Sequence, residues 1–176
     1  TCARAAREEG TPWLGVATSA EALELRRLGD SGRLLCWLTA PGAPFAELIA
    51  SDVDVTASSV AQLDEILAVG AKARVHLKVD TGLNRNGASR SDWVALFESA
   101  AAAQGRQKIE VVGMWSHLAA ADHPTHLAND IQEAAFDEAI VLAAEAGLEP
   151  EWIHLANSAA VATRPSAHRD LVRVGI

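Results

Sequence analysis

The chain has 176 residues, of which 49% are hydrophobic and 22% are charged, and its formal net charge at pH 7 is -8. This composition is typical of a globular protein that buries one substantial core. Lys and Arg are scattered along the chain, which argues against a nucleic-acid surface because phosphate contacts need clustered cations. A small molecule is therefore the expected ligand.

The cysteine count and the apolar runs exclude further classes. Cys2 and Cys36 form no CxxC motif, so neither a disulfide framework nor a zinc site is indicated. No run approaches the roughly 20 apolar residues of a membrane span, and no secretory leader pattern opens the chain. A cytoplasmic protein is predicted. The chain opens without Met, inside a helix pattern that ends at Gly10, and stops directly after a strand pattern, so we expect both ends to be cut.

Short β-branched or aromatic runs alternate with Ala-rich amphipathic segments, which is typical of βα units in a parallel sheet. No linker separates these segments, so residues 1–176 are predicted to form one partial barrel domain, without a further β domain. In chain order the pattern predicts a strand at 13–17, a helix at 19–28, a strand at 34–38, a weaker helix at 43–50, a strand at 53–56, a helix at 59–69, a strand at 73–79, a helix at 91–103, a strand at 109–115, a helix at 126–146, a strand at 151–155, a weaker helix at 157–163 and a strand at 171–174.

The faces of one strand distinguish between the two common parallel-sheet folds. Along residues 75–80 the odd positions are apolar, whereas the even positions carry His76, Lys78 and Asp80. Strands of an open sheet with helices on both faces should be apolar on both, so a polar face favours a barrel interior that leads to a site. Seven strands cannot close an eight-stranded barrel. The predicted fold class is therefore α/β, an incomplete TIM-type (β/α)8 barrel covering about strands 2–8 of 8.

Four motifs carry most of the chemistry: "LKVDTGLNRNG" (77–87), "MWSHLAAAD" (114–122), "IHLANSAA" (153–160) and "DLVRVGI" (170–176). In this order they resemble successive motifs of alanine racemase. The stretches "WLGVATSAEALELR" and "DVDVTASSVAQL" resemble earlier strands of that family. The resemblance implies a pyridoxal 5'-phosphate barrel followed by a C-terminal β domain, in a homodimer that interconverts L- and D-alanine for peptidoglycan synthesis.

The resemblance also implies roles for single residues. Arg85 resembles the arginine that contacts the phenolic oxygen of the cofactor, and Lys78 the often carboxylated lysine that positions this arginine. His117 resembles the histidine stacked on the pyridine ring. Arg173 resembles the arginine that faces the pyridine nitrogen. Because a guanidinium keeps its proton and disfavours a second positive charge beside it, Arg173 is the most diagnostic of these residues.

The remaining cofactor contacts are implied in the same way. His154 and Asn157 resemble supporting residues that lie beside Arg173. The residues that resemble the phosphate-binding set are Ser158, Gly175 and Ile176.

The chain departs from the family at both acid/base groups. The family's racemases use a lysine at the end of the first strand, as Schiff-base partner and as one base, and a tyrosine from the partner's C-terminal domain as the other. This chain has no Tyr, and neither Lys72 nor Lys108 follows a first-strand pattern. We therefore expect no catalytic residue among these 176 and no racemase activity of the chain alone.

Simpler explanations exist for single residues. Lys78 and Asp80 taken alone fit an internal ion pair at a strand end. The "DHPTH" segment, residues 122–126, is interpreted as a solvated loop with a helix cap, and no metal is expected because no usual zinc spacing fits it. The five Trp residues are interpreted as packing residues.

Three other functions stay open for the same barrel. They are a non-catalytic pyridoxal phosphate carrier, a racemase for another amino acid, and a decarboxylase. A decarboxylase is expected to place a carboxylate near the pyridine nitrogen, so Arg173 argues against it.

Overall fold

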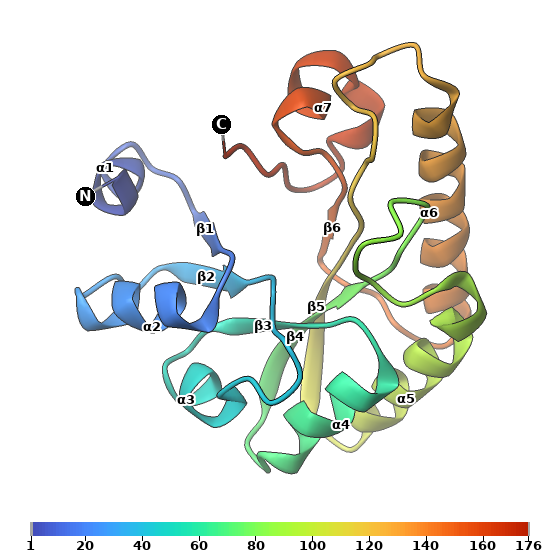
Figure 1. Cartoon of the computed structure of the whole chain (residues 1–176). Helices are drawn as coiled ribbons and strands as arrows, with labels where there is room; N and C mark the ends of the chain where they lie inside the picture. Colours follow the sequence, from blue (N-terminus) through green and yellow to red (C-terminus); the bar gives the residue numbers. More distant parts are fainter. Residues whose placement is uncertain (1, 176) are drawn as a thin grey trace.

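The computed structural model describes residues 2–175, and its core is a parallel sheet with helices along its outer side (Figure 1). The strands are hydrogen-bonded in the order β1-β2-β3-β4-β5-β6, and every neighbouring pair is parallel. The predicted alternation of strands and helices is confirmed. The elements are α1 (Cys2–Glu8), β1 (Trp13–Val16), α2 (Ser19–Arg27), β2 (Arg33–Cys36), α3 (Phe45–Ala50), β3 (Asp54–Ala57), α4 (Val60–Ala68), β4 (Ala73–Lys78), α5 (Trp93–Gly105), β5 (Ile109–Trp115), α6 (Leu127–Glu145), β6 (Trp152–His154) and α7 (Ser158–Thr163), with short 3-10 helices at Arg90–Asp92 and Pro165–Ala167.

The sheet is strongly curled, and side chains from its two edges meet. The rings of Trp13 in β1 and Trp152 in β6 pack edge to face with centroids 5.8 Å apart. Strands lie about 4.8 Å apart, so the edges of a flat six-stranded sheet would be separated by about 24 Å. The sheet therefore forms a half-barrel, with a concave inner face on which residues distant in the sequence come together.

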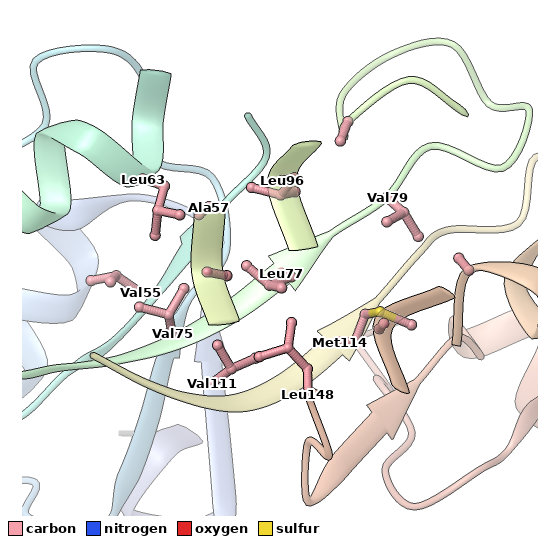
Figure 2. Packing of buried hydrophobic residues seen from close by; sticks show 14 of the residues in the cluster. Val55, Ala57, Leu63, Val75, Leu77, Val79, Leu96, Val111, Met114 and Leu148 are labelled. Carbon is pink, nitrogen blue, oxygen red and sulfur yellow. The ribbon is translucent and has the colours of Figure 1, made fainter. Parts of the chain in front are cut away.

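The outer face of the sheet is the apolar one. Val55, Val75 and Leu77 are fully buried there, and Leu63 of α4 and Leu96 of α5 pack over them (Figure 2). The intervening positions of β4 point to the concave side. The predicted difference between the two faces of this strand is confirmed, and it aims polar side chains at the interior.

The predicted strand at 171–174 is wrong, because the described residues form six strands and this segment is not one of them. Arg173 makes a single bridge with Asn157, in which its N–H donates to the carbonyl of Ala156 at 3.0 Å. β6 ends at His154, and Asn157 already caps α7 by accepting from the Ala160 N–H. The neighbouring backbone thus turns into a helix after one bridge, so no ladder can continue along 171–174.

Candidate functional site

A cavity of about 450 Å³ opens where β4, β5 and β6 end. Carboxyl ends of parallel strands are the usual place for the chemistry of α/β barrels. His154 lies behind the cavity wall rather than in it, and Ile176 lies outside the described residues. The predicted residues that line the cavity are Lys78, Arg85, His117, Asn157, Ser158, Arg173 and Gly175.

The turn after β4 presents Arg85. The side chain of Asp80 accepts hydrogen bonds from the N–H groups of Gly82 (2.9 Å) and Asn84 (3.2 Å), which closes the turn. Gly87 has φ +125°, and a Cβ there would lie 2.6 Å from the Asp80 nitrogen, so the turn requires glycine. The Asp80 side chain thus stabilises the backbone of the turn. Among residues 2–175 it forms no ion pair with Lys78.

Lys78 ends β4 with its side chain buried. Its ammonium lies 4.1 Å from the ring centroid of Trp115, a cation–π contact. Burial and the nearby charges of Arg85 and Arg173 lower the pKa of Lys78 to about 8. A substantial fraction of this amine is therefore neutral, and nucleophilic, at slightly alkaline pH.

His117 follows β5 and faces the same cavity. Burial and the charges of Arg173, Arg85 and Lys78 lower its pKa to about 4, so its imidazole is neutral at pH 7. Its Nε2 lies 3.4 Å from the amide nitrogen of Asn157. A neutral ring adds no further charge to a wall that already carries three cations.

Arg173 is fixed by three acceptors. Its guanidinium donates to His154 Nδ1 at 2.9 Å and to the backbone oxygens of Ser116 at 2.7 Å and Leu155 at 2.9 Å. Burial lowers the pKa of Arg173 to about 9, which still leaves the group charged at neutral pH. The structure thus places His154 in contact with this arginine.

Small polar groups line the part of the cavity beside α7. The N–H of Gly175 donates to the hydroxyl of Ser158 at 3.0 Å. Asn157 uses its side-chain oxygen as the helix cap, accepting from Ala160 at 3.0 Å. A hydroxyl and a backbone N–H both suit phosphate oxygens, and here the N–H is directed at the hydroxyl.

The cavity carries excess positive charge. Within residues 2–175, no carboxylate lies within 4.0 Å of the charged nitrogens of Lys78, Arg85 or Arg173. Asp122 also lines the cavity, but its side chain is exposed and lies 3.7 Å from His123. An anion is the ligand that such a set of cations favours.

Sequence reasoning missed the role of Trp115. It was interpreted as a packing residue, and it is indeed 97% buried, yet its ring lines the cavity and stacks on His154 with the planes 8° apart. It also contacts Lys78 and Arg173, at 4.1 and 4.9 Å. Its place at the end of β5, just before Ser116 and His117, was the available signal. Trp37, likewise interpreted as packing, lines the cavity as well.

Residues 122–126 form a loop that ends at the cap of α6. His126 caps α6 by accepting from the Ala128 N–H at 3.1 Å, which confirms the loop-and-cap interpretation of residues 122–126. In the described part of the chain, no three His, Cys, Asp or Glu side chains gather closely enough to hold a metal ion. No described helix is both long and apolar enough to cross a membrane.

Comparison with known proteins identifies the family. The chain matches the family model "Alanine racemase, N-terminal domain" over residues 1–176. It is 52% identical over 178 residues to the alanine racemase of Salinispora arenicola, covering 99% of this chain and 48% of that protein. The corresponding values for the Streptomyces coelicolor enzyme are 44% over 184 residues, with 99% and 47% covered. The chain thus spans about half the length of the curated relatives it matches.

Solved structures give the same result. Alanine racemase from D-cycloserine-producing Streptomyces lavendulae superposes with a TM-score of 0.96 at 48% identity, over 99% of this chain and 47% of that one. The Clostridium difficile 630 enzyme in complex with cycloserine superposes with a TM-score of 0.91 at 27% identity, over 99% and 49%. The chain therefore belongs to the alanine racemase family, with its match in the N-terminal domain.

Proposed function

We propose that this chain forms the cofactor-binding part of an alanine racemase, a pyridoxal phosphate enzyme that interconverts L- and D-alanine. In this proposal the six-stranded half-barrel is part of an incomplete (β/α)8 barrel. The observation that carries the proposal is the meeting of Lys78, Arg85 and Arg173 with a neutral His117 at one cavity. Within residues 2–175, none of these three cations is paired with a carboxylate. Membership of the family supports it independently.

The chemistry of the donor groups fits pyridoxal phosphate. Ser158 and the Gly175 N–H would hold the phosphate, and Arg85 would contact the phenolic oxygen. Arg173 would face the pyridine nitrogen and His117 would lie against the ring. When bound, the cofactor supplies an electron sink that eases removal of the α-proton of an amino acid.

In this proposal the residues of the chain control the charge of the cofactor ring and do not themselves remove the α-proton. Arg173 keeps its proton at neutral pH and is fixed by three acceptors, so it cannot supply a second positive charge to the ring nitrogen. A carboxylate at this place would instead favour protonation of the ring nitrogen. This favours the racemase over the decarboxylase on the same barrel.

The two bases are proposed to come from other parts of the complete protein. The chain has no Tyr, and neither Lys72 nor Lys108 lines the cavity. The proposed lysine base would precede Thr1 in the protein and the tyrosine would come from the partner in a homodimer. A cytoplasmic location also stays a prediction.

Carboxylation of Lys78 is proposed as part of the same site. A neutral amine is needed to react with carbon dioxide, and the pKa of about 8 provides it. The product would be an anion beside Arg85, where the described residues offer no carboxylate partner. A carbamate carbon signal in the NMR spectrum after incubation with [13C]bicarbonate, lost in Lys78→Arg, would test this.

The decisive experiment compares the full-length protein with the 176-residue chain. Cofactor binding is followed by absorbance and D-alanine formation from L-alanine by chiral chromatography. We expect both in the full-length protein and no D-alanine from the chain alone. Arg85→Gln should weaken cofactor binding, whereas Arg27→Gln should not, because Arg27 pairs with Glu24 on the exposed face of α2. A full-length protein that binds cofactor without racemising alanine would favour the carrier, or a racemase for another amino acid.

A further inference from the structure

A line of buried polar side chains runs from the cavity to the opposite end of the sheet. Arg173 meets His154 Nδ1 at 2.9 Å, and His154 Nε2 meets His76 Nδ1 at 3.0 Å. His76 Nε2 then faces the carboxylate of Asp54 at 3.5 Å. Asp54, His76 and His154 are each fully buried. Only the first contact of this line, between Arg173 and His154, belongs to the cavity wall described above.

The chemistry of the first group sets the direction of every proton in the line. A guanidinium only donates, so His154 Nδ1 must be an acceptor without a proton. A neutral His154 then carries its proton on Nε2 and donates it to His76 Nδ1. His76, neutral in turn, carries its proton on Nε2, directed at Asp54. Both imidazoles are thus held in one tautomer between a cation and an anion.

The charge state of each member agrees with this direction. Burial lowers the pKa of both His154 and His76, so neither ring is protonated at neutral pH. Burial opposes ionisation of Asp54, yet the contacts with His76, Arg33 and Arg74 hold its pKa below the ordinary value. His76 Nε2 makes no hydrogen bond among the described residues, and the Asp54 carboxylate at 3.5 Å is the acceptor that it faces.

The surrounding residues leave space for these polar side chains and shield them from solvent. A Cβ on Gly113 of β5 would lie 2.1 Å from His76 Nδ1, so only glycine leaves space for this ring. Trp13 packs edge to face on His76 at 5.5 Å, and Trp115 stacks on His154 at 5.6 Å. A polar line enclosed by aromatic rings is costly unless each proton has its acceptor.

We propose that Asp54, His76 and His154 form a positioning relay that sets the orientation of Arg173. The proposal rests on the proposed function, because Arg173 is assigned there to the pyridine nitrogen. Through two neutral rings the Asp54 carboxylate fixes the proton pattern that leaves Nδ1 of His154 free to accept. Without Asp54 only Arg173 favours this proton pattern, so reversal of both rings becomes easier. Arg173 would then face an N–H instead of an acceptor.

The first test reads the tautomers directly. Solid-state NMR of [15N]histidine-labelled full-length protein, with His76→Gln and His154→Gln to assign the signals by difference, distinguishes protonated from bare ring nitrogens. We expect both rings to carry the proton on Nε2 and to stay neutral at pH 7. A proton on Nδ1 of either ring, or an imidazolium, would overturn the relay. This measurement needs no substrate.

The second test separates the relay from simple loss of stability. Asp54→Asn removes the terminal charge, whereas Arg74→Gln removes an ion pair of the same carboxylate without touching either histidine. We expect Asp54→Asn to lower kcat on the order of tenfold or more, as loss of a supporting group typically does, and to shift the absorbance of the bound cofactor. Arg74→Gln should leave both within about twofold, because Arg33 still pairs with the Asp54 carboxylate and neither histidine contact is lost. Equal losses in the two variants would contradict the proposal.

A third pair of variants covers the case in which Asp54→Asn does not fold. Glutamine can accept and donate at once, as His154 does, whereas leucine can do neither. His154→Gln should therefore retain at least about tenfold more activity than His154→Leu, and equal activities would overturn the relay. If the parent protein itself makes no D-alanine, the proposed function and the relay's role in it fail together. A wrong tautomer in an active protein overturns the relay alone.

Discussion

At the amino ends of the strands, Asp54 contacts Arg33 at 2.6 Å and Arg74 at 2.5 Å, and Arg74 also pairs with Asp52. At the carboxyl ends, Lys78, Arg85 and Arg173 face one cavity, and the described residues supply no carboxylate within ion-pair distance. Cations that are already paired stabilise the folded chain. Cations left together raise its free energy until an anion joins them, which is the arrangement expected of a ligand site. The amino ends of the strands therefore contribute mainly to stability and the carboxyl ends mainly to binding, so substitutions at each end should have different readouts. Asp54 is the exception, because the proposed relay also connects it to Arg173.

The largest effect on stability is expected at the amino end. Asp54→Ala leaves two arginines without their buried partner, and should lower the free energy of unfolding by about 3–5 kcal/mol. Glu24→Gln, in a pair whose side chains are 69% and 51% exposed, should change it by less than about 1 kcal/mol. Urea unfolding of both variants measures the difference. A loss below about 1 kcal/mol in Asp54→Ala would show that this end does not stabilise the sheet.

The carboxyl end should instead respond to pH. The pKa of His117 is about 4 in the folded chain and 6.5 ordinarily, so the unfolded chain binds more protons between these values. The free energy of unfolding should therefore fall as the pH drops from 6.5 to 4, by as much as about 3 kcal/mol from this residue. His117→Asn should flatten the slope, whereas His123→Asn, on an exposed side chain, should not. An unchanged slope in His117→Asn would contradict the assignment.

The sequence predicted the elements that depend on local pattern. Alternation along residues 75–80 correctly placed His76 and Lys78 on the interior face, and the turn chemistry of residues 80–87 correctly placed Arg85 at a strand end. The prediction of a seventh strand was wrong because the pattern of a strand does not show which segment lies beside it. Residues 171–174 are apolar and β-branched enough, but the chain beside them has already turned into α7.

The relay illustrates what local pattern cannot predict. His76 and His154 are 78 residues apart and sit on strands that are not neighbours, so only the curl of the sheet brings them to 3.0 Å. Trp115 was misjudged for a related reason. A buried tryptophan at a strand end has the same signature in the sequence whether it packs in a core or forms the wall of a cavity.

Reversing one charge at the carboxyl end should change the reaction. Arg173→Glu in the full-length protein places a carboxylate where the proposed function places the pyridine nitrogen. Racemisation should fall on the order of 100-fold, and the bound cofactor should convert to its amine form during incubation with alanine. Arg169→Gln, which loses a pair with Asp137 outside the cavity, is the matched control. Absence of the amine form from Arg173→Glu, measured by chromatography of the released cofactor, would refute this role.

The smallest predicted effect concerns two glutamines, one near each end of the sheet, whose side chains hydrogen-bond backbone groups. Gln132 of α6 donates to Thr81 Oγ1 at 3.2 Å and to the His117 carbonyl at 3.1 Å, and accepts from the Ala119 N–H at 2.8 Å. It thereby ties the Arg85 turn to the His117 loop without lining the cavity. Gln104 of α5 accepts from the Val111 N–H at 2.7 Å near the start of β5.

Truncating either glutamine to alanine should lower the free energy of unfolding by about 1–2 kcal/mol, because a buried partner loses its hydrogen bond. Only Gln132→Ala should also weaken cofactor binding, by a few-fold, since only it releases the two loops that carry Arg85 and His117. Titration of both full-length variants with pyridoxal phosphate, at a temperature where each is fully folded, compares the two affinities. Equal affinities would mean that the two loops keep their positions without the hydrogen bonds from Gln132. The binding residues would then be positioned by the strand ends alone.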